Sequence, residues 1–440
     1  MLEIISILIQ FLIFLVLFSF PLKPSFLNNH IKINDYNFSL VDAHCLNIIL
    51  FLFFCIFISF LNIDQRIVFK IYISLALIFL ILNKKEIKFH LKNFDKVYFL
   101  FFVIITSSIF IFISQNLKLE WDGHHWLAKV LVFYNDLKIQ ELKNVSIHPE
   151  YPHLGSYVWS FFWKNALIDF EYMGRFFQVY FYSISLIVIL QLLKIKDALL
   201  KSLFLFLLVV LTFEPYLFAG YQEYLIFSTL IFSVYLIEKL NFDKNNFKIL
   251  SIIILILYLN CWFKDEGIIY FIVFGSLLIL ISKIKPNYKL ILLFLIVILL
   301  YSQFALQKYL IGIYDFPQTT SISRVLSDIF DFKILIFKIT KIISHIIIAF
   351  IKYPLWLIVM VSLLFCWLLK INKSKNFQYF SLCLFLNLVF IISIFFTFKS
   401  FDFMLRVSLD RLLFQTSGFY IIFLIYILNK FKFFNKMKIN

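Results

Sequence analysis

The chain has 440 residues, of which 62% are hydrophobic and only 15% are charged. Soluble domains carry about one quarter charged residues, so this composition excludes an ordinary soluble globular protein. The net charge of +16 would suggest a nucleic-acid partner for a soluble chain. Membrane proteins concentrate Lys and Arg in cytoplasmic loops, and we favour this explanation over nucleic-acid binding.

Long apolar segments recur along the chain. Most are roughly 16 to 21 residues long, the length of helix that crosses a bilayer core about 30 Å thick. We therefore predict an all-α integral membrane protein with about thirteen transmembrane helices and an extracytoplasmic loop that bears amphipathic helices. The predicted spans lie near residues 4–22, 45–62, 67–83, 97–115, 174–194, 198–214, 218–238, 248–263, 267–283, 288–306, 354–371, 378–398 and 413–430. The first has no Lys or Arg before it and no cleavage signal after it, so we expect a retained helix rather than a signal peptide.

The cysteines lie in or beside these apolar segments, without the short spacings typical of metal ligands. We interpret them as small hydrophobic side chains of the membrane core, and expect from them neither a disulfide framework nor a metal site. They are Cys45, Cys55, Cys261, Cys366 and Cys383.

Residues 336–351 form a further apolar stretch, which Lys338, Lys341 and His345 interrupt. We predict an interfacial or re-entrant helix here rather than a membrane span. Counting this stretch as a span would also move the Lys-rich connection that follows residue 369 to the opposite side from the other Lys-rich connections.

Connections rich in Lys alternate along the chain with connections that contain almost none. By the positive-inside rule, the Lys-rich connections face the cytoplasm. They contain Lys84, Lys85, Lys88, Lys92 and Lys96, then Lys194, Lys196 and Lys201, Lys239, Lys244 and Lys248, Lys283, Lys285 and Lys289, Lys370, Lys373 and Lys375, and in the tail Lys430, Lys432, Lys436 and Lys438. The polar segments 116–173, 214–223, 262–267 and 399–412, joined by 307–335, then lie on the extracytoplasmic side. Because ionisable groups near a membrane are costly and usually functional, we expect these segments to form one composite site.

The first polar segment begins KLEWDGHHWLAK, which places Glu120 and Asp122 directly after a predicted span. Two carboxylates at this spacing can act as acid and base or can share a cation, and the alternative is an ordinary acidic loop start. Apolar residues between Trp126 and Glu141 recur at helical spacing, with Lys129 on the opposite, polar face. We predict an amphipathic helix that lies along the membrane.

The same segment continues with SIHPEYPHLGSYVW. Pro149 and Pro152 restrict the backbone, so Glu150 and Tyr151 are expected in a stiff turn that presents their side chains at defined positions. The histidines of this segment, His148 among them, lack a standard ligand spacing. We favour hydrogen-bonding or structural roles for them over metal binding.

The next two segments carry compact groups of charge. Glu223 begins a predicted membrane helix, where it can bind substrate or simply complement the helix dipole. In the short sequence NCWFKDEG, Lys264, Asp265 and Glu266 form either a binding cluster or a solvated turn.

The last polar segment, SFDFMLRVSLDRLLFQ, holds Arg406, Asp410 and Arg411 just before the final predicted span. Arg406 and Asp410 fall four residues apart on one helical face, a spacing that permits an ion pair. Arginine at this depth is well suited to bind a phosphate or pyrophosphate group.

In order and type, these motifs resemble those of the polytopic glycosyltransferases of the GT-C fold, the clan that includes protein O-mannosyltransferases and bacterial enzymes that use polyprenyl-phosphate sugars. WDGHHWLAK, HPEYP, GYQEYL, WFKDEG and SLDRLLFQ follow one another between residues 118 and 415, as in bacterial members. One departure is that the clan usually places its first outer loop after the first span, whereas here it follows the fourth predicted span.

The resemblance implies an inverting transfer of a sugar from a polyprenyl-phosphate donor to an envelope glycan, lipid or protein acceptor, at the outer face of a bacterial inner membrane. A carboxylate of the first outer loop serves the clan as base or metal ligand, a role that carries over to Asp122, with Glu120 as second candidate. Arg406 or Arg411, with Lys264, would stabilise the leaving lipid phosphate.

Further roles follow from the resemblance. Glu150, Tyr151 and Glu223 would hydrogen-bond sugar hydroxyls. The other candidates for substrate binding are Lys129, His148, Asp265, Glu266 and Asp410. Trp121, Trp126 and Trp159 either stack on sugar rings or anchor the protein at the membrane interface, and we favour anchoring. No Gly-rich nucleotide-binding loop is visible, which favours a lipid-linked donor; no cofactor is predicted, and a divalent cation is left open.

We divide the chain into four parts. Residues 1–96 are N-terminal transmembrane helices, and 97–306 are a GT-C-like core with the outer loop 116–173. Residues 307–353 form an outer loop with the interfacial helix, and 354–440 form C-terminal transmembrane helices with a basic cytoplasmic tail.

Other classes of membrane protein compete with this interpretation. A transporter or flippase of lipid-linked glycans would place charges near the membrane midplane and break its helices with Gly or Pro. A polysaccharide polymerase or ligase would carry a large outer loop with paired Arg in its C-terminal half, for which 307–335 with Arg324 is a modest candidate. A purely structural membrane protein is the third alternative.

Overall fold

The computed structural model describes residues 2–31, 37–93, 95–116, 118–145, 148–193, 195, 197–240, 242, 246–313, 330–368, 374–397 and 401–430, and every regular element within these ranges is helical. The N-terminal helices are α1 (Leu2–Leu17), α2 (Pro24–His30), α3 (Leu40–Leu61), α4 (Gln65–Leu82), α5 (Lys84–Asn93) and α6 (Lys96–Asn116). They are followed by α7 (Trp121–Tyr134), η1 (Ile139–Asn144), α8 (Leu154–Lys164), α9 (Tyr172–Leu192), α10 (Ala198–Thr212), η2 (Pro215–Phe218) and α11 (Glu223–Lys239). The remaining helices are α12 (Phe247–Tyr258), η3 (Leu259–Trp262), α13 (Glu266–Ile281), α14 (Pro286–Ala305), η4 (Leu306–Ile311), α16 (Phe332–Lys352), α17 (Pro354–Leu368), α18 (Lys375–Thr397) and α19 (Phe401–Lys430).

Length and composition make many of these helices candidates for crossing a membrane. Among the described residues, 8 helices are long and apolar enough: α3, α4, α6, α9, α14 with η4, α16, α18 and α19. Shorter apolar helices are α1, α10, α12 with η3, α13 and α17. These helices support the predicted α-helical membrane protein, and the number of about thirteen spans stays a prediction.

The centre of the bundle is formed by α9 and α11. The apolar window of α9 is buried along its whole length, and α9 packs against α3, α6, α8, α10 and α11. The helix α11 in turn contacts α9, α12 and α19. Both helices carry apolar residues on all sides, as expected of helices surrounded by protein rather than by lipid or water.

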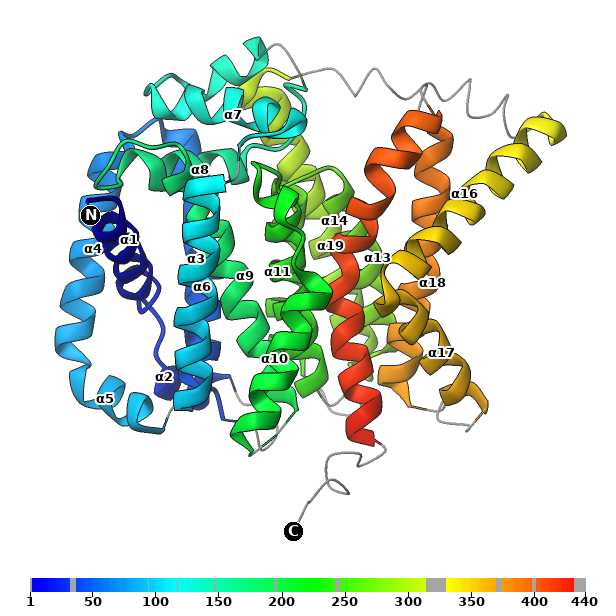
Figure 1. The fold of residues 1–440 in the computed structure, drawn as a ribbon, viewed down its shortest axis with the longest axis horizontal. Helices are drawn as coiled ribbons and strands as arrows, with labels where there is room; N and C mark the ends of the chain where they lie inside the picture. The colour runs from blue at the N-terminus through cyan, green and yellow to red at the C-terminus, as the bar shows by residue number, and fades with distance from the viewer. Residues whose placement is uncertain are drawn as a thin grey trace.

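The helix predicted over 336–351 is α16, which is continuous and which by length and composition is also a candidate span; its interfacial position stays a prediction. Its basic residues are satisfied on the side that meets the C-terminal helices: the Lys338 ammonium lies 5.2 Å from the centre of the Phe401 ring, and Lys341 pairs with Asp402 at 2.6 Å. The opposite side, with Ile347 and Ile351, is exposed and apolar. Figure 1 shows α16 strongly tilted against α18 and α19.

Two helix boundaries differ from the prediction. The amphipathic helix expected over 126–141 is α7, which begins at Trp121 and ends at Tyr134, so Asp122 lies in its first turn. The helix ends there because Asp136 has a positive φ of 55° and breaks the helical path. In addition, α19 begins at Phe401, so most of the predicted loop 399–412 is the first three turns of the last helix.

One end of the bundle carries the Lys-rich helix α5. In Figure 1, α5, with Lys84, Lys85, Lys88 and Lys92, lies at one end, where α19 also ends, and α7 and α8 lie at the other. The predicted basic residues Lys194, Lys196, Lys244, Lys370, Lys373, Lys432, Lys436 and Lys438, and Arg324 of the predicted outer loop, lie outside the described residues. The arrangement is the one that the positive-inside rule requires if α5 faces the cytoplasm.

This sidedness can be measured by cysteine labelling, because all the native cysteines are buried. Lys88 of α5 and Glu141 of η1 are both exposed and lie at opposite ends. In sealed right-side-out vesicles, we expect a membrane-impermeant maleimide to label Glu141→Cys at once and Lys88→Cys only after permeabilisation. Labelling of both variants from the same side would contradict the assigned orientation.

Candidate functional site

A cavity of about 670 Å³ opens at the end of the bundle that carries α7. It is bounded by α7, the turn at 148–151, the turn before α13 and the first part of α19. Most of the predicted site residues line it: Glu120, Asp122, Lys129, His148, Tyr151, Lys264, Glu266, Arg406, Asp410 and Arg411. The polar segments that were predicted to share one side of the membrane therefore meet in one place, and Glu150, Glu223 and Asp265 are not part of the lining.

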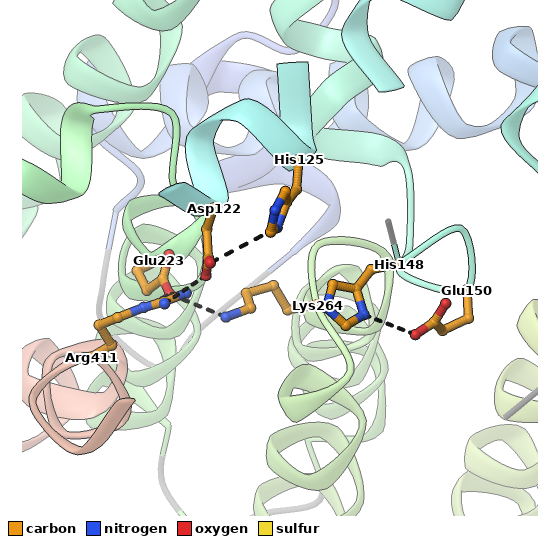
Figure 2. Close-up of polar contacts among 7 residues, drawn as sticks. All are labelled: Asp122, His125, His148, Glu150, Glu223, Lys264 and Arg411. Carbon is orange, nitrogen blue, oxygen red and sulfur yellow. Dashed lines mark hydrogen bonds and ion pairs between the residues drawn. The ribbon is translucent and has the colours of Figure 1, made fainter. Parts of the chain in front are cut away.

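The closest contacts in this site join three of the four segments through Arg411. Its Nη1 lies 2.6 Å from Asp122 Oδ2, and its Nη2 lies 2.6 Å from Glu223 Oε1. Lys264 Nζ reaches the same Glu223 oxygen at 3.1 Å and Glu266 Oε1 at 3.2 Å (Figure 2). The two cations and three carboxylates form a continuous network of charge-assisted hydrogen bonds.

Glu223 is at the centre of this network and has no exposed surface. As the first residue of α11, its carboxylate also lies at the positive end of a helix dipole. Its other oxygen, Oε2, makes no hydrogen bond within the described part of the chain. A buried carboxylate is costly, so the two cations around Oε1 are what make this position tolerable. The substrate-binding role predicted for Glu223 would therefore be indirect, through Arg411 and Lys264.

Two glycines allow the first polar segment to reach the network. A Cβ at Gly123 would lie 2.1 Å from the Ala219 carbonyl oxygen, and Gly220 has φ of 96°, which favours glycine. The Glu120 N–H also donates to the Ala219 oxygen at 3.4 Å. The start of α7 thus packs directly on the backbone of the loop before α11, which brings Asp122 to Arg411.

The HPEYP turn forms a second group of contacts beside the first. His148 Nδ1 lies 3.1 Å from Glu150 Oε1, and the His148 and Tyr151 rings are parallel, with centroids 4.6 Å apart. The Trp126 ring also stacks on Tyr151, with centroids 5.8 Å apart. Tyr151 is therefore held by two ring contacts at the edge of the cavity.

Lys129 differs from the expectation that it lies on a solvated helix face. It is 1% exposed, and its Nζ donates to the backbone oxygens of Pro149 at 3.2 Å and Tyr151 at 2.5 Å. Burial lowers the pKa of Lys129 to about 7, although Asp265 and Glu150 act in the opposite direction. The protonated and the neutral amine can both donate two hydrogen bonds, so the contact to the turn persists in either form.

The C-terminal charges do not pair as their spacing suggested. Arg406 donates through Nε to the Asp402 backbone oxygen at 3.3 Å and is exposed at the cavity. Asp410 instead accepts from Lys352 Nζ of α16 at 2.9 Å and from Tyr353 Oη at 3.3 Å. The ion pair that the spacing of Arg406 and Asp410 permitted is therefore not formed. Asp410 has a partner on the neighbouring helix α16 instead, which spacing along α19 could not reveal.

The three tryptophans have different environments. Trp121 is 80% exposed at the cavity rim, whereas Trp126 and Trp159 are buried. The indole N–H of Trp159 donates to the Glu171 backbone oxygen at 3.2 Å. The favoured interpretation, anchoring at the membrane interface, does not fit Trp126 or Trp159, because both are buried inside the protein, and a buried Trp159 cannot stack on a sugar either. Of the three, only Trp121 offers an open ring face.

Several residues of the cavity were not among the predicted site residues. Tyr221 supports Arg411, whose guanidinium carbon lies 4.5 Å from the Tyr221 ring centre. His125 Nδ1 is 4.0 Å from Asp122 Oδ1, and Gln415 lines the cavity one helical turn after Arg411. Gln415 could have been predicted, because it lies four residues after Arg411 and so on the same face of the helix. Nothing in the sequence distinguishes Tyr221 from the other tyrosines.

No group of three or more His, Cys, Asp or Glu side chains among the described residues is arranged to hold a metal ion. The carboxylates of the network are already paired with Arg411 and Lys264. The question of a divalent cation thus stays open, with no ligand set for it within these ranges.

Comparisons with protein-family models, with curated proteins and with solved structures found no match. The resemblance to GT-C glycosyltransferases therefore rests on the sequence motifs alone.

The buried network predicts a large effect of neutralising Glu223. In Glu223→Gln, the Arg411 and Lys264 cations lose their shared carboxylate, and we expect the free energy of unfolding to fall by about 3–5 kcal/mol. Unfolding of the purified protein in detergent, followed by circular dichroism, measures this change. Glu141→Gln, an exposed carboxylate outside the cavity, should leave the stability unchanged. An equal stability of Glu223→Gln and wild type would show that the network does not stabilise the fold.

We expect Asp265 to make the stability of the fold depend on pH. Burial, with Glu266 beside it, raises the pKa of Asp265 from 3.8 to about 7. The folded protein then keeps a proton that the unfolded chain releases, so stability is lost as the pH rises from 3.8 to about 7, by at most about 1.4 kcal/mol per pH unit. We expect Asp265→Asn to be more stable than wild type above pH 7, and this difference to disappear below pH 4. Thermal unfolding across this pH range measures it, and a difference independent of pH would contradict the assignment.

Proposed function

We propose that this protein is a membrane glycosyltransferase that moves a sugar from a polyprenyl-phosphate donor to an acceptor hydroxyl at the extracytoplasmic face of a bacterial inner membrane. The observation that carries the proposal is the convergence of separate polar segments on one cavity beside apolar helices. The cavity combines cations suited to a phosphate with carboxylates and hydrogen-bonding groups suited to a sugar.

The phosphate group is assigned to the side of the cavity formed by α19. Arg406 lies exposed there, and Arg411 has N–H groups beyond those that bind Asp122 and Glu223. Arginine binds phosphate through paired N–H groups, and cations fixed in advance stabilise the charge that develops on a leaving phosphate. The network around Glu223 would keep Arg411 aligned during the reaction.

The lipid part of the donor is assigned to the apolar edge of the same cavity. Ile394, Phe403, Met404 and Val407 line it, and Phe403 and Val407 are largely exposed. Ile394 belongs to the last turn of α18 and the other three to the first turns of α19, and both helices contact α16. The phosphate of a lipid donor would therefore reach the arginines while its lipid chain lies against apolar side chains. A water-soluble nucleotide sugar would not need such an apolar surface.

The acceptor is assigned to the side formed by α7 and the HPEYP turn. Asp122 presents Oδ1 to this part of the cavity, while its Oδ2 is bound to Arg411. Its carboxylate is needed in either of two roles: as the base that the resemblance implies, or as the group that holds Arg411 in place. Glu120, also at the cavity, is the second carboxylate candidate.

The decisive experiment compares transfer by wild type and Asp122→Asn. Membrane vesicles receive a polyprenyl-phosphate sugar with a radiolabelled sugar, and incorporation into the envelope fraction is measured at equal protein abundance. We expect the variant to lose at least about 100-fold in rate, the scale of a general base or of one charged group at a transition state. Glu141→Gln is the matched control and should keep full activity.

The outcomes separate the competing classes. Unchanged transfer in Asp122→Asn would remove Asp122 from the site. Polymerisation of lipid-linked oligosaccharides without use of the monosaccharide donor would favour a polymerase or ligase. Movement of labelled lipid across the membrane without a new glycosidic bond would favour a transporter or flippase.

A further inference from the structure

His148 has an uncommon backbone conformation. Its φ is 52°, in the left-handed region that few non-glycine residues adopt, although His, Asn and Asp adopt it more often than the others. The Tyr151 N–H donates to the His148 carbonyl oxygen at 3.2 Å, which closes a turn around Pro149. Such a conformation costs roughly 1–3 kcal/mol and persists only where surrounding contacts enforce it.

The contacts that enforce it come from α7. Lys129 Nζ donates to the carbonyl oxygens of Pro149 and Tyr151, so one buried side chain holds the turn at two points. The Trp126 ring packs on Tyr151, and the Tyr151 ring packs on His148. The imidazole is thus fixed by covalent, hydrogen-bonded and stacking constraints together.

The fixed imidazole has one nitrogen engaged and one available. Nδ1 is bound to Glu150 Oε1 at 3.1 Å, and Nε2 makes no hydrogen bond to another described residue. The side chain is 33% exposed and lines the cavity, and Figure 2 shows its contact with Glu150. A carboxylate on Nδ1 sets the tautomer in which Nε2 can accept a proton, and it stabilises the imidazolium that results.

Asp122 is less suited to accept a proton. Its Oδ2 is already engaged in an ion pair of 2.6 Å with Arg411 Nη1. A proton taken up by Asp122 would weaken the contact that aligns Arg411. Among the described residues, His148 contacts the Glu150 carboxylate and the rings of Tyr151 and His125, the latter with centroids 5.9 Å apart.

We propose that His148 Nε2 accepts the proton of the acceptor hydroxyl, with Glu150 and Lys129 as positioning residues. The inference rests on the function proposed above. The acceptor O–H bond breaks as its proton passes to Nε2, and the acceptor oxygen forms a bond to the anomeric carbon. The bond from that carbon to the phosphate oxygen breaks, and its electron pair leaves with the polyprenyl phosphate. The imidazolium then returns its proton to solvent through its exposed edge.

The test uses two substitutions that tolerate the left-handed backbone. Asn adopts this region more readily than other non-glycine residues and cannot serve as a base, so His148→Asn removes the imidazole while keeping the turn. Glycine also fits, and His148→Gly leaves space for free imidazole. His124→Asn changes the exposed neighbouring histidine of α7, which does not line the cavity, and serves as the matched control.

Transfer is measured with radiolabelled polyprenyl-phosphate sugar and washed envelope as acceptor, together with binding of the labelled donor to the purified protein in detergent. We expect His148→Asn to lose about 100-fold or more in transfer rate while it binds donor normally. Added imidazole should restore transfer in His148→Gly by about tenfold or more, with saturation, and should not affect His148→Asn. Glu150→Gln should show a smaller loss, because the imidazole stays in place.

Three results would overturn the inference, and they differ in what they say about the function. Wild type without transfer would refute both the proposed function and the role of His148. Wild-type transfer together with near-normal transfer by His148→Asn would refute the role of His148 alone and return the base to Asp122. Loss of donor binding in His148→Asn, or failure of imidazole to rescue His148→Gly, would make His148 a structural residue.

Discussion

The rest of the site depends on a carboxylate buried among helices, that of Glu223. It is completely inaccessible, and the Arg411 and Lys264 cations both bind its Oε1. These partners are 188 and 41 residues away in the chain, so satisfying one charge fixes the relative positions of α11, α19 and the turn before α13. A charge in such a place is tolerated only when its partners are held in good geometry, which makes the arrangement specific as well as stable.

Asp122 extends this constraint to the outer segment. Its contact with Arg411 ties α7 to the bundle, and the close approach of Gly123 to the Ala219 carbonyl allows it. The helix α7 also positions the HPEYP turn, because Lys129 donates hydrogen bonds to two of its carbonyl oxygens. The buried Glu223 carboxylate thus positions Arg411, Arg411 positions α7 through Asp122, and α7 positions the HPEYP turn. Each of these contacts brings side chains to the cavity.

The cavity has two chemically different sides as a consequence. The arginines come from α19, together with Asp410 and several apolar side chains, whereas α7, the HPEYP turn and the turn before α13 supply the histidines, Tyr151, two lysines and the other carboxylates. The ion pairs of α16 with Asp402 and Asp410 hold the outer part of α19 that carries Arg406 and Arg411. Such a division suits a substrate with a charged, lipid-linked end and a polar end, and it underlies both proposals made here.

The sequence by itself determined the apolar helices of a membrane protein and the polar segments that gather at one cavity, while the orientation of the two ends stays a prediction. These properties follow from run length, hydropathy and charge, which are local. Tertiary structure decided which charges pair: Asp410 binds Lys352 rather than Arg406, and Lys129 is buried rather than solvated. It also decided that α16 is a continuous helix and that Trp159 is enclosed. The reason is physical, because the partner of a charge or ring in a helical bundle is set by which helices are neighbours, and spacing along one helix carries no information about that.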